Sequence, residues 1–282
     1  MFTGVPMSTS SRLHCQAYGP DDAASIVFLH GGGVAGFMWQ PVIERLPEYH
    51  CLAPDLPQHG GSQEVGPFSM QLAAEQVAAL ICEQAHGARC YLVGLSEGAQ
   101  VAVQLLANSP ELIGRALISS ALLLPLSGLR WLMSPGALAW TYRLSVAPFK
   151  RSDWWIRINM KYSANVPEQL FPQFKQAFVA LSESAFVNIM LANQRFRMPA
   201  GMQAVNTPAL IVVGHKEYAA MHRSARELAE ALPQAKPVQL NLGRSATLAR
   251  EHNWALTEPD LFAETVRAWI EGQPLPPELR DL

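Results

Sequence analysis

The sequence has little charge and no basic segment. Charged residues make up 16% of its 282 residues, and the formal net charge is -2. Binding to nucleic acid needs clustered lysine and arginine side chains that neutralise a run of phosphates. The composition is that of a globular protein with a large apolar core and gives no reason to expect a nucleic-acid partner.

Cysteine is also scarce, and its spacing excludes the common metal and redox motifs. The 4 cysteines show no C-x-x-C pattern, and Cys51, Cys82 and Cys90 lie in or beside apolar segments that we expect to be buried. This favours free core thiols, for Cys15 as well, over disulfides or zinc ligands. We expect no metal site and no cofactor.

Targeting and membrane segments are missing as well. Residues 1–15 lack the basic segment and apolar run of a signal peptide, so a cytoplasmic location is the default expectation. A membrane helix needs about 18 or more uninterrupted apolar residues. The most apolar region, 116–147, is broken too often to meet that length, by Pro125, Arg130, Pro135 and Arg143.

What the sequence does contain is an alternation of strands and helices. Continuously apolar runs are typical of strands covered on both faces, and six of them are present, at 25–30, 50–55, 90–96, 115–121, 208–215 and 237–242. Helical patterns lie between or after them at 70–84, 99–108, 219–232 and 259–271. This order predicts an α/β fold with a doubly wound, mostly parallel sheet.

The alternation is interrupted once, between residues 124 and 202. Tryptophans and phenylalanines lie there among prolines and expected helices, so this segment is interpreted as a helical insertion. The core domain then consists of residues 1–123 and 203–282. The last ten residues, 273–282, are expected to be a loosely held surface end.

A single serine lies between two glycines where a strand is expected to become a helix. Ligands of doubly wound sheets bind at the carboxyl ends of the strands, and Ser96 is placed at such an end. Glycine is needed at positions 94 and 98 for a steric reason, because a sharp turn brings backbone segments so close together that side chains would clash. The segment matches the G-x-S-x-G elbow and makes Ser96 the candidate nucleophile.

A serine nucleophile needs a base, and the chain has 8 histidines. His252 follows the last expected parallel strand and can lie at the carboxyl edge of the sheet. His215 and His222 are its rivals, because they follow the strand at 208–215, but both precede the final strand. A solvated position is the simpler interpretation for the early histidines His14, His50 and His86.

The acid of the site is assigned to Glu217, directly after the strand at 208–215. Its carboxylate can orient an imidazole and stabilise the imidazolium that forms during proton transfer. The order Ser96, Glu217, His252 is the serine, acid, histidine order of this architecture. No carboxylate lies in the segment after the strand at 115–121, so the other acid position is empty.

A glycine-rich segment supplies a place for negative charge. His30 is followed by three glycines, whose bare backbone can approach a substrate carbonyl. We assign the backbone N–H groups of Gly32 and Glu97 as the oxyanion hole, in which one donor is typically worth about 2.7–4 kcal/mol. A phosphate loop is the competing interpretation, but neither G-x-G-x-x-G nor G-x-x-x-x-G-K-[ST] is present.

Taken together, these motifs resemble those of the α/β-hydrolase superfamily, and the likeness covers nearly all of the chain except the insertion. The resemblance implies the fold predicted above and a helical cap formed by the insertion. The segments that carry it are HGGG (30–33), DLPQHGGS (55–62), GLSEG (94–98), GHKE (214–217) and EHNWALTEPDLF (251–262).

The chain departs from the pattern of the superfamily at four places. Glu217 stands where aspartate is usual, and Glu97 follows the nucleophile where many relatives have an apolar or aromatic residue. Gln58 occupies a frequent glycine position in a turn that shapes the fold without carrying chemistry. The segment RSATLARE (244–251) precedes His252 where a short glycine-rich turn is common.

These residues predict a serine hydrolase that cleaves a carboxylic ester, lactone or thioester of a small hydrophobic substrate through an acyl-enzyme. The aromatic residues of the insertion suggest an apolar acyl or alcohol pocket. To this pocket the sequence adds Phe37, Met38, Trp39 and Trp254.

Three alternative functions stay open. The same triad can cleave a carbon–carbon bond or transfer an acyl group to an acceptor other than water. A receptor built on a hydrolase scaffold is the rival of another class, and the intact serine, histidine and glycines argue against it. A homodimer stays open, because these residues do not reveal the oligomeric state.

Overall fold

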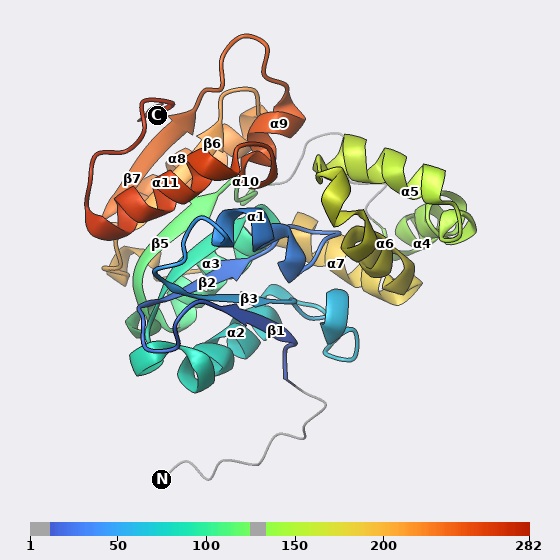
Figure 1. Ribbon diagram of the computed structural model, residues 1–282, viewed down its shortest axis with the longest axis horizontal. Coiled ribbons are helices and arrows are strands. Elements are labelled where there is room, and N and C mark those ends of the chain that lie inside the picture. Colours follow the sequence, from blue (N-terminus) through green and yellow to red (C-terminus); the bar gives the residue numbers. More distant parts are fainter. Residues whose placement is uncertain (1–11, 125–133) are drawn as a thin grey trace.

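A central eight-stranded sheet organises the protein (Figure 1), whose computed structural model describes residues 12–124 and 134–282. The strand order is β1-β3-β2-β4-β5-β6-β7-β8, with parallel pairing from β3 to β7 and an antiparallel strand at each edge. The strands are β1 (Cys15–Tyr18), β2 (Ser25–Leu29), β3 (His50–Pro54), β4 (Cys90–Leu95), β5 (Ile113–Ser119), β6 (Ala209–Gly214), β7 (Ala235–Leu240) and β8 (Leu279–Asp281).

Helices cover both faces of this sheet. Along β2, Val27 and Leu29 join the apolar cluster that includes α2, α3 and α8, whereas Ile26 and Phe28 join the cluster that includes α1 and α11. This alternation explains why the strand sequences are continuously apolar. The core helices are α1 (Gln40–Ile43), α2 (Met70–Gln84), α3 (Glu97–Asn108), α8 (Ala219–Ala231), α9 (Leu248–His252), α10 (Trp254–Thr257) and α11 (Pro259–Glu271).

The six predicted strands and four predicted helices are confirmed. For α2 and α11 the first and the last residue are the predicted ones. The prediction for the C-terminal tail is wrong. Its β8 pairs with β7 through Leu279 and Leu240, and Leu279 is buried. A three-residue strand with one buried side chain leaves no periodic pattern in the sequence.

All four cysteines are free, as predicted. Cys51 and Cys90 are buried on strands, but the expectation of burial is wrong for Cys82, which is exposed. Cys82 lies on α2, whose other face carries the buried residues. The apolar neighbours of Cys82 in the sequence therefore point away from it, because adjacent positions in a helix face different directions.

Four α-helices of the described residues follow β5 and precede β6, where the sequence predicts an insertion. They form a separate group at one side of the core in Figure 1. None of the helices in the described part of the chain is long and apolar enough to cross a membrane. Pro125 and Arg130 lie outside the described residues. The four helices are α4 (Pro135–Ser145), α5 (Asp153–Asn159), α6 (Phe171–Ala180) and α7 (Glu183–Arg195).

Gln58 connects the core with this insertion. Its φ of 61° is in the left-handed region, which explains why glycine is common at this position. The Oε1 atom of Gln58 accepts hydrogen bonds from the N–H of Phe68 (2.8 Å) and from Nδ2 of Asn188 on α7 (3.0 Å). The glutamine side chain thus makes a contact between core and insertion that glycine could not make.

The turn between β4 and α3 is packed against the neighbouring strand. A Cβ atom on Gly98 would lie 2.1 Å from the carbonyl oxygen of Leu29 in β2, and one on Gly94 would lie 2.5 Å from the carbonyl oxygen of Gly98. Both contacts are with backbone, which cannot swing aside like a flexible side chain. The steric reason expected for these two glycines is confirmed.

We therefore predict that Gly98→Ala lowers the free energy of unfolding by about 1–3 kcal/mol, the usual cost of overpacking a core. Chemical denaturation of the two proteins measures this loss. Gly136→Ala on α4 is the matched control, because a Cβ there meets nothing within 4 Å. That control should be neutral or stabilising by about 0.4–1 kcal/mol. Equal stabilities of the two variants would contradict the packing interpretation.

Candidate active site

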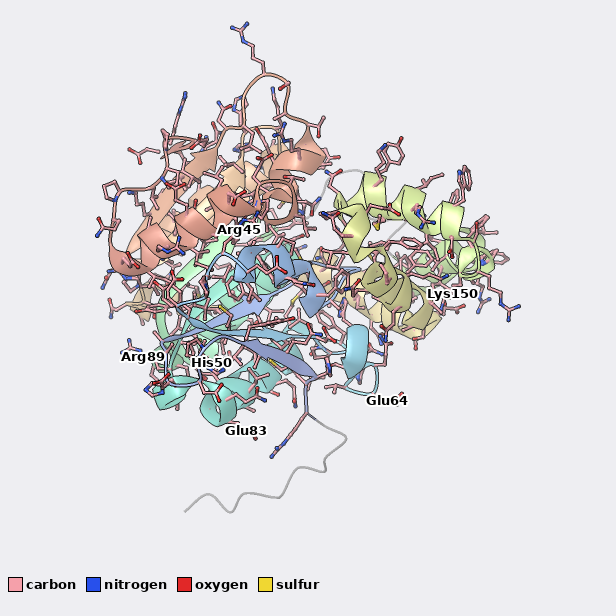
Figure 2. All side chains as sticks on the ribbon, viewed as in Figure 1. Arg45, His50, Glu64, Glu83, Arg89 and Lys150 are labelled. Carbon is pink, nitrogen blue, oxygen red and sulfur yellow. The ribbon has the colours of Figure 1, made fainter. Side chains whose placement is uncertain are left out.

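Four carboxyl side chains are buried in the described part of the chain, namely Asp55, Glu97, Glu217 and Glu251. Other charged groups such as Glu64, Glu83 and Arg89 lie at the periphery of the molecule (Figure 2). Buried carboxyl groups are costly unless they are paired or hydrogen-bonded, so their surroundings indicate what they do. Two of them, Glu97 and Glu217, are predicted site residues, and Glu251 directly precedes His252.

Ser96 occupies the predicted turn between β4 and α3. Its φ of 56° and ψ of -112° are unusual for a residue with a side chain. Backbone hydrogen bonds hold it there, because its N–H donates to the carbonyl of Ser119 (2.9 Å) and its own carbonyl accepts from the N–H of Gln100 (3.1 Å). Such strain persists only where the surrounding structure enforces it, and it is frequent at active sites.

The structure brings His252 and Glu217 together. Nδ1 of His252, at the end of α9, lies 2.5 Å from Oε1 of Glu217, in the loop after β6. The imidazole side chain is 25% exposed, whereas that of Glu217 is 1% exposed. The bond to Nδ1 fixes the ring and leaves Nε2 for another partner.

A second serine supports the carboxylate of Glu217. Its Oε2 atom accepts hydrogen bonds from Oγ of Ser120 (3.0 Å) and from the N–H of Gly214 (2.9 Å). Ser120 directly follows β5, in the position where the sequence offered no acid. Ser120 was not among the predicted site residues, although its place after a parallel strand at the same edge of the sheet was a signal that could have found it.

Glu251 is the other carboxyl group near the histidine, and it has a different surrounding. It is fully buried, and its two oxygens accept hydrogen bonds from the backbone N–H groups of Lys216 (2.6 Å) and Leu242 (3.2 Å). These bonds hold the loops that follow β6 and β7. Glu251 is the last residue of the segment RSATLARE (244–251), so this departure from the superfamily pattern supplies a side chain that holds two loops together.

Two cavities meet at Ser96. The smaller one, of about 200 Å³, is lined by Ser96, Glu217 and His252, with Gln100, Leu122, Asn193, Tyr218, Met221 and Leu248. We call it the histidine cavity. Ser96 and Asn193 also line the second, of about 340 Å³, which we call the insertion cavity. Gly32, Gly33, Glu97 and Asn159 line it too, with the apolar side chains of Val146, Phe174, Phe178, Leu181, Phe186, Ile189 and Met190.

The two residues predicted to supply the oxyanion donors lie close together, and both line the insertion cavity with Ser96. Glu97 is the first residue of α3, where backbone N–H groups have no partner within the helix. A Cβ on Gly32 would lie 3.2 Å from Oε2 of Glu97. Gly32, Ser96 and Glu97 all line the insertion cavity, which is the arrangement that backbone donors to a substrate carbonyl need.

The other predicted pocket residues are not in these cavities. Phe37, Met38, Trp39 and Trp254 are buried in the core and line neither cavity, so the prediction of a pocket role is wrong for them. Trp39 and Trp254 both pack on Phe262 of α11, with ring centroids 5.3 Å and 4.3 Å apart. Large aromatic side chains contribute most where they fill the core, and the sequence alone does not separate this use from ligand binding.

The rival histidines lie elsewhere. Nδ1 of His215 lies 3.1 Å from the side-chain oxygen of Gln239, and His14 contacts Asp55 at 3.0 Å. Neither His215 nor His222 lines the two cavities at Ser96. Within residues 12–124 and 134–282, no group of three or more His, Cys, Asp and Glu side chains could hold a metal ion.

Comparison with known proteins identifies the family. Residues 26–269 match the alpha/beta hydrolase family. The chain belongs to the α/β-hydrolase family. It is 27% identical over 274 residues to an AB hydrolase superfamily protein of Gibberella zeae, covering 95% of this chain and 87% of that protein.

Esterases are among the relatives of this α/β hydrolase. It is 42% identical over 98 residues to an esterase of Mycobacterium tuberculosis, but that match spans 34% of this chain and only 32% of the esterase. The crystal structure of the enol-lactonase of Burkholderia xenovorans has the same fold, with a TM-score of 0.69 and 22% identity over 92% of this chain and 96% of that one. The likeness to the enol-lactonase shows the shared fold.

Proposed function

We propose that this α/β hydrolase is a serine esterase with Ser96 as nucleophile, His252 as base and Glu217 as acid. The observation that carries the proposal is the contact of 2.5 Å between His252 and Glu217 beside the strained Ser96, with all three residues lining one cavity. The remaining bonds to Glu217, donated by Ser120 and Gly214, hold its side chain in place to orient the imidazole.

In the proposed reaction, Nε2 of His252 takes the proton of Ser96 while Oγ attacks the ester carbonyl. The N–H groups of Gly32 and Glu97 stabilise the negative oxygen of the tetrahedral intermediate. The carbon–oxygen bond to the alcohol then breaks, and His252 gives its proton to the departing oxygen. Water, deprotonated by His252, attacks the acyl-enzyme, and the carboxylic acid leaves as Ser96 regains its proton.

The two cavities suggest how the substrate is oriented. The departing alcohol must lie near His252 to receive its proton, which places it in the histidine cavity. The acyl part then extends into the insertion cavity, whose apolar lining suits a hydrophobic chain or ring. In this proposal residues 124–202 form a cap over the core of residues 1–123 and 203–282, and the natural substrate is a hydrophobic ester, lactone or thioester.

The related reactions are separated by their products. Cleavage of a carbon–carbon bond or transfer to an acceptor other than water would use the same three residues, and product analysis by mass spectrometry distinguishes them. A receptor without turnover would bind ligands without consuming them. A cytoplasmic location and a homodimer stay predictions.

We predict that a fluorophosphonate probe labels the protein covalently and that Ser96→Ala abolishes both labelling and the hydrolysis of p-nitrophenyl esters. Removing the hydroxyl removes the atom that forms the acyl-enzyme, while circular dichroism should show an unchanged fold. Labelling is read by intact-protein mass spectrometry. Undiminished turnover by the Ser96→Ala variant would remove Ser96 from the role.

The assignment of the acid predicts that Glu217→Gln lowers kcat by about two orders of magnitude or more, since the imidazolium loses its counter-charge and the ring its orientation. Glu251→Gln is the matched comparison, because the same change there removes an acceptor of backbone hydrogen bonds. We expect that variant to lose stability in denaturation more than kcat at 25 °C. The reverse pattern would move the acid to Glu251.

The orientation of the substrate predicts that Met190→Trp narrows the insertion cavity. The ratio of kcat/KM for p-nitrophenyl octanoate to that for the acetate should fall by about tenfold, since only the long acyl chain needs the filled space. Leu144→Trp is the control, because Leu144 on α4 is 67% exposed and lines neither cavity. An unchanged ratio for Met190→Trp would place the acyl chain elsewhere.

A further inference from the structure

One buried carboxyl group at the site has no role in the mechanism above. The side chain of Glu97 is 0% exposed, and neither of its oxygens makes a well-formed hydrogen bond among the described residues, although the nearby Asn193 amide favours the carboxylate. It extends from the start of α3 toward Gly32 and toward His59, whose Nε2 lies 3.3 Å from Oε1 of Glu97. An ionised carboxylate in such a place would be costly.

The protonation of His59 indicates what Glu97 can donate or accept. Nδ1 of His59 lies 3.0 Å from the carbonyl oxygen of Pro57, an acceptor, so Nδ1 carries a proton. In neutral imidazole the other nitrogen, Nε2, is then an acceptor. It has no hydrogen-bond partner of its own in the described structure. A carboxylate facing it would set two acceptors together, whereas a protonated carboxyl group can donate to it.

A second buried histidine has its tautomer fixed in the same manner. Nδ1 of His30 donates to the carbonyl of Gly31 (2.8 Å), and its Nε2 accepts from the N–H of Leu56 (2.9 Å). The rings of His30 and His59 lie 4.9 Å apart. These bonds connect the glycine loop with the turn that contains His59, so a bond from Glu97 to His59 would link α3 to the same network.

The other ionisable group in this turn is already satisfied. The carboxylate of Asp55 accepts hydrogen bonds from the N–H groups of Gly36 (2.7 Å) and Gly61 (2.7 Å) and contacts His14. From the insertion, α7 brings the uncharged Asn193 to the cavity beside Glu97. No described cationic side chain forms an ion pair with Glu97 except His59, were it protonated.

Burial acts on this pair in the direction that keeps both groups neutral. It raises the pKa of Glu97 to about 8, although the Asn193 amide favours the carboxylate. Burial, with a smaller contribution from His30, lowers the pKa of His59 to about 3. Between these values the carboxylic acid and the neutral imidazole coexist.

We propose that Glu97 works as a neutral carboxylic acid that donates its O–H to Nε2 of His59, and that this bond positions the oxyanion hole at Gly32. The inference rests on the proposed function only where it concerns rate. Loss of the proton would remove the bond and place a negative charge beside the oxygen that becomes negative during the reaction. Glu97 would then be a positioning residue, in addition to its backbone N–H.

The pH profile tests the effect on rate. Relative to the Glu97→Gln variant, kcat/KM of the native enzyme should fall by about tenfold between pH 7 and pH 9, as expected for one group with a pKa near 8. Glu97→Gln cannot ionise, and its amide can still donate to His59, so its ratio of pH 9 to pH 7 rates should stay level. Equal ratios in the two proteins would overturn the proposal.

A second substitution separates the hydrogen bond from the charge. Glu97→Leu is also neutral but cannot donate a hydrogen bond. The ratio of its rates at pH 9 and pH 7 should therefore stay near one, while its kcat at pH 7 falls at least about tenfold below that of Glu97→Gln. Equal kcat values for these two variants would show that the bond does not position the site. Both comparisons use variants of one position, so general disturbance of the turn affects both alike.

Stability supplies a readout that needs no turnover. Glu97 keeps its proton in the folded protein but releases it on unfolding above its unfolded pKa near 4.5, so its contribution to stability is lost as the pH rises from about 4.5 to about 8. The Tm of the native protein should therefore fall relative to that of Glu97→Gln across this range. A constant difference would contradict a neutral Glu97, whether or not the protein proves to be an esterase.

Discussion

The close contact between α3 and β2 is the constraint on which the site depends. Gly98 leaves no room for a side chain against the carbonyl of Leu29, so the first turn of α3 lies directly on the end of the neighbouring strand. This contact requires a sharp exit from β4, and Ser96 takes the positive φ that such an exit demands. The same contact places Glu97, the first residue of α3, beside Gly32. The proposed nucleophile and the proposed oxyanion donors thus depend on one close backbone approach.

The proposed acid and base depend on a separate set of loops. Glu217 accepts hydrogen bonds from Ser120 and Gly214. Glu251 instead accepts hydrogen bonds from backbone N–H groups in the two loops that follow β6 and β7. The two buried carboxyl groups at this edge of the sheet thus have different partners. Glu217 contacts an imidazole, whereas Glu251 accepts hydrogen bonds from backbone amides. The environment, rather than the residue type, separates their roles.

Much of this could be predicted, because parallel strands and sharp turns have strong sequence patterns. The continuous apolar runs indicated the six central strands, and Ser96, Glu217 and His252 could be placed at their carboxyl ends by chain order. The pattern could not distinguish core aromatics such as Trp254 from pocket residues, since both are large and apolar. Ser120 was missed because its place after a parallel strand was the one signal for it, and its bond to Glu217 depends on the folded loops.

The bonds of Gln58 and Gln100 have a consequence for how ligands enter. Gln58 binds the side chain of Asn188, and Nε2 of Gln100 donates to the backbone carbonyl of Asn193, so α7 is tethered to the core at both residues. Widening the insertion cavity by moving α7 would break both tethers. The wall formed by α6, with Phe174 and Phe178, has neither of these two tethers. A gate for bulky ligands is therefore more easily built from α6 than from α7.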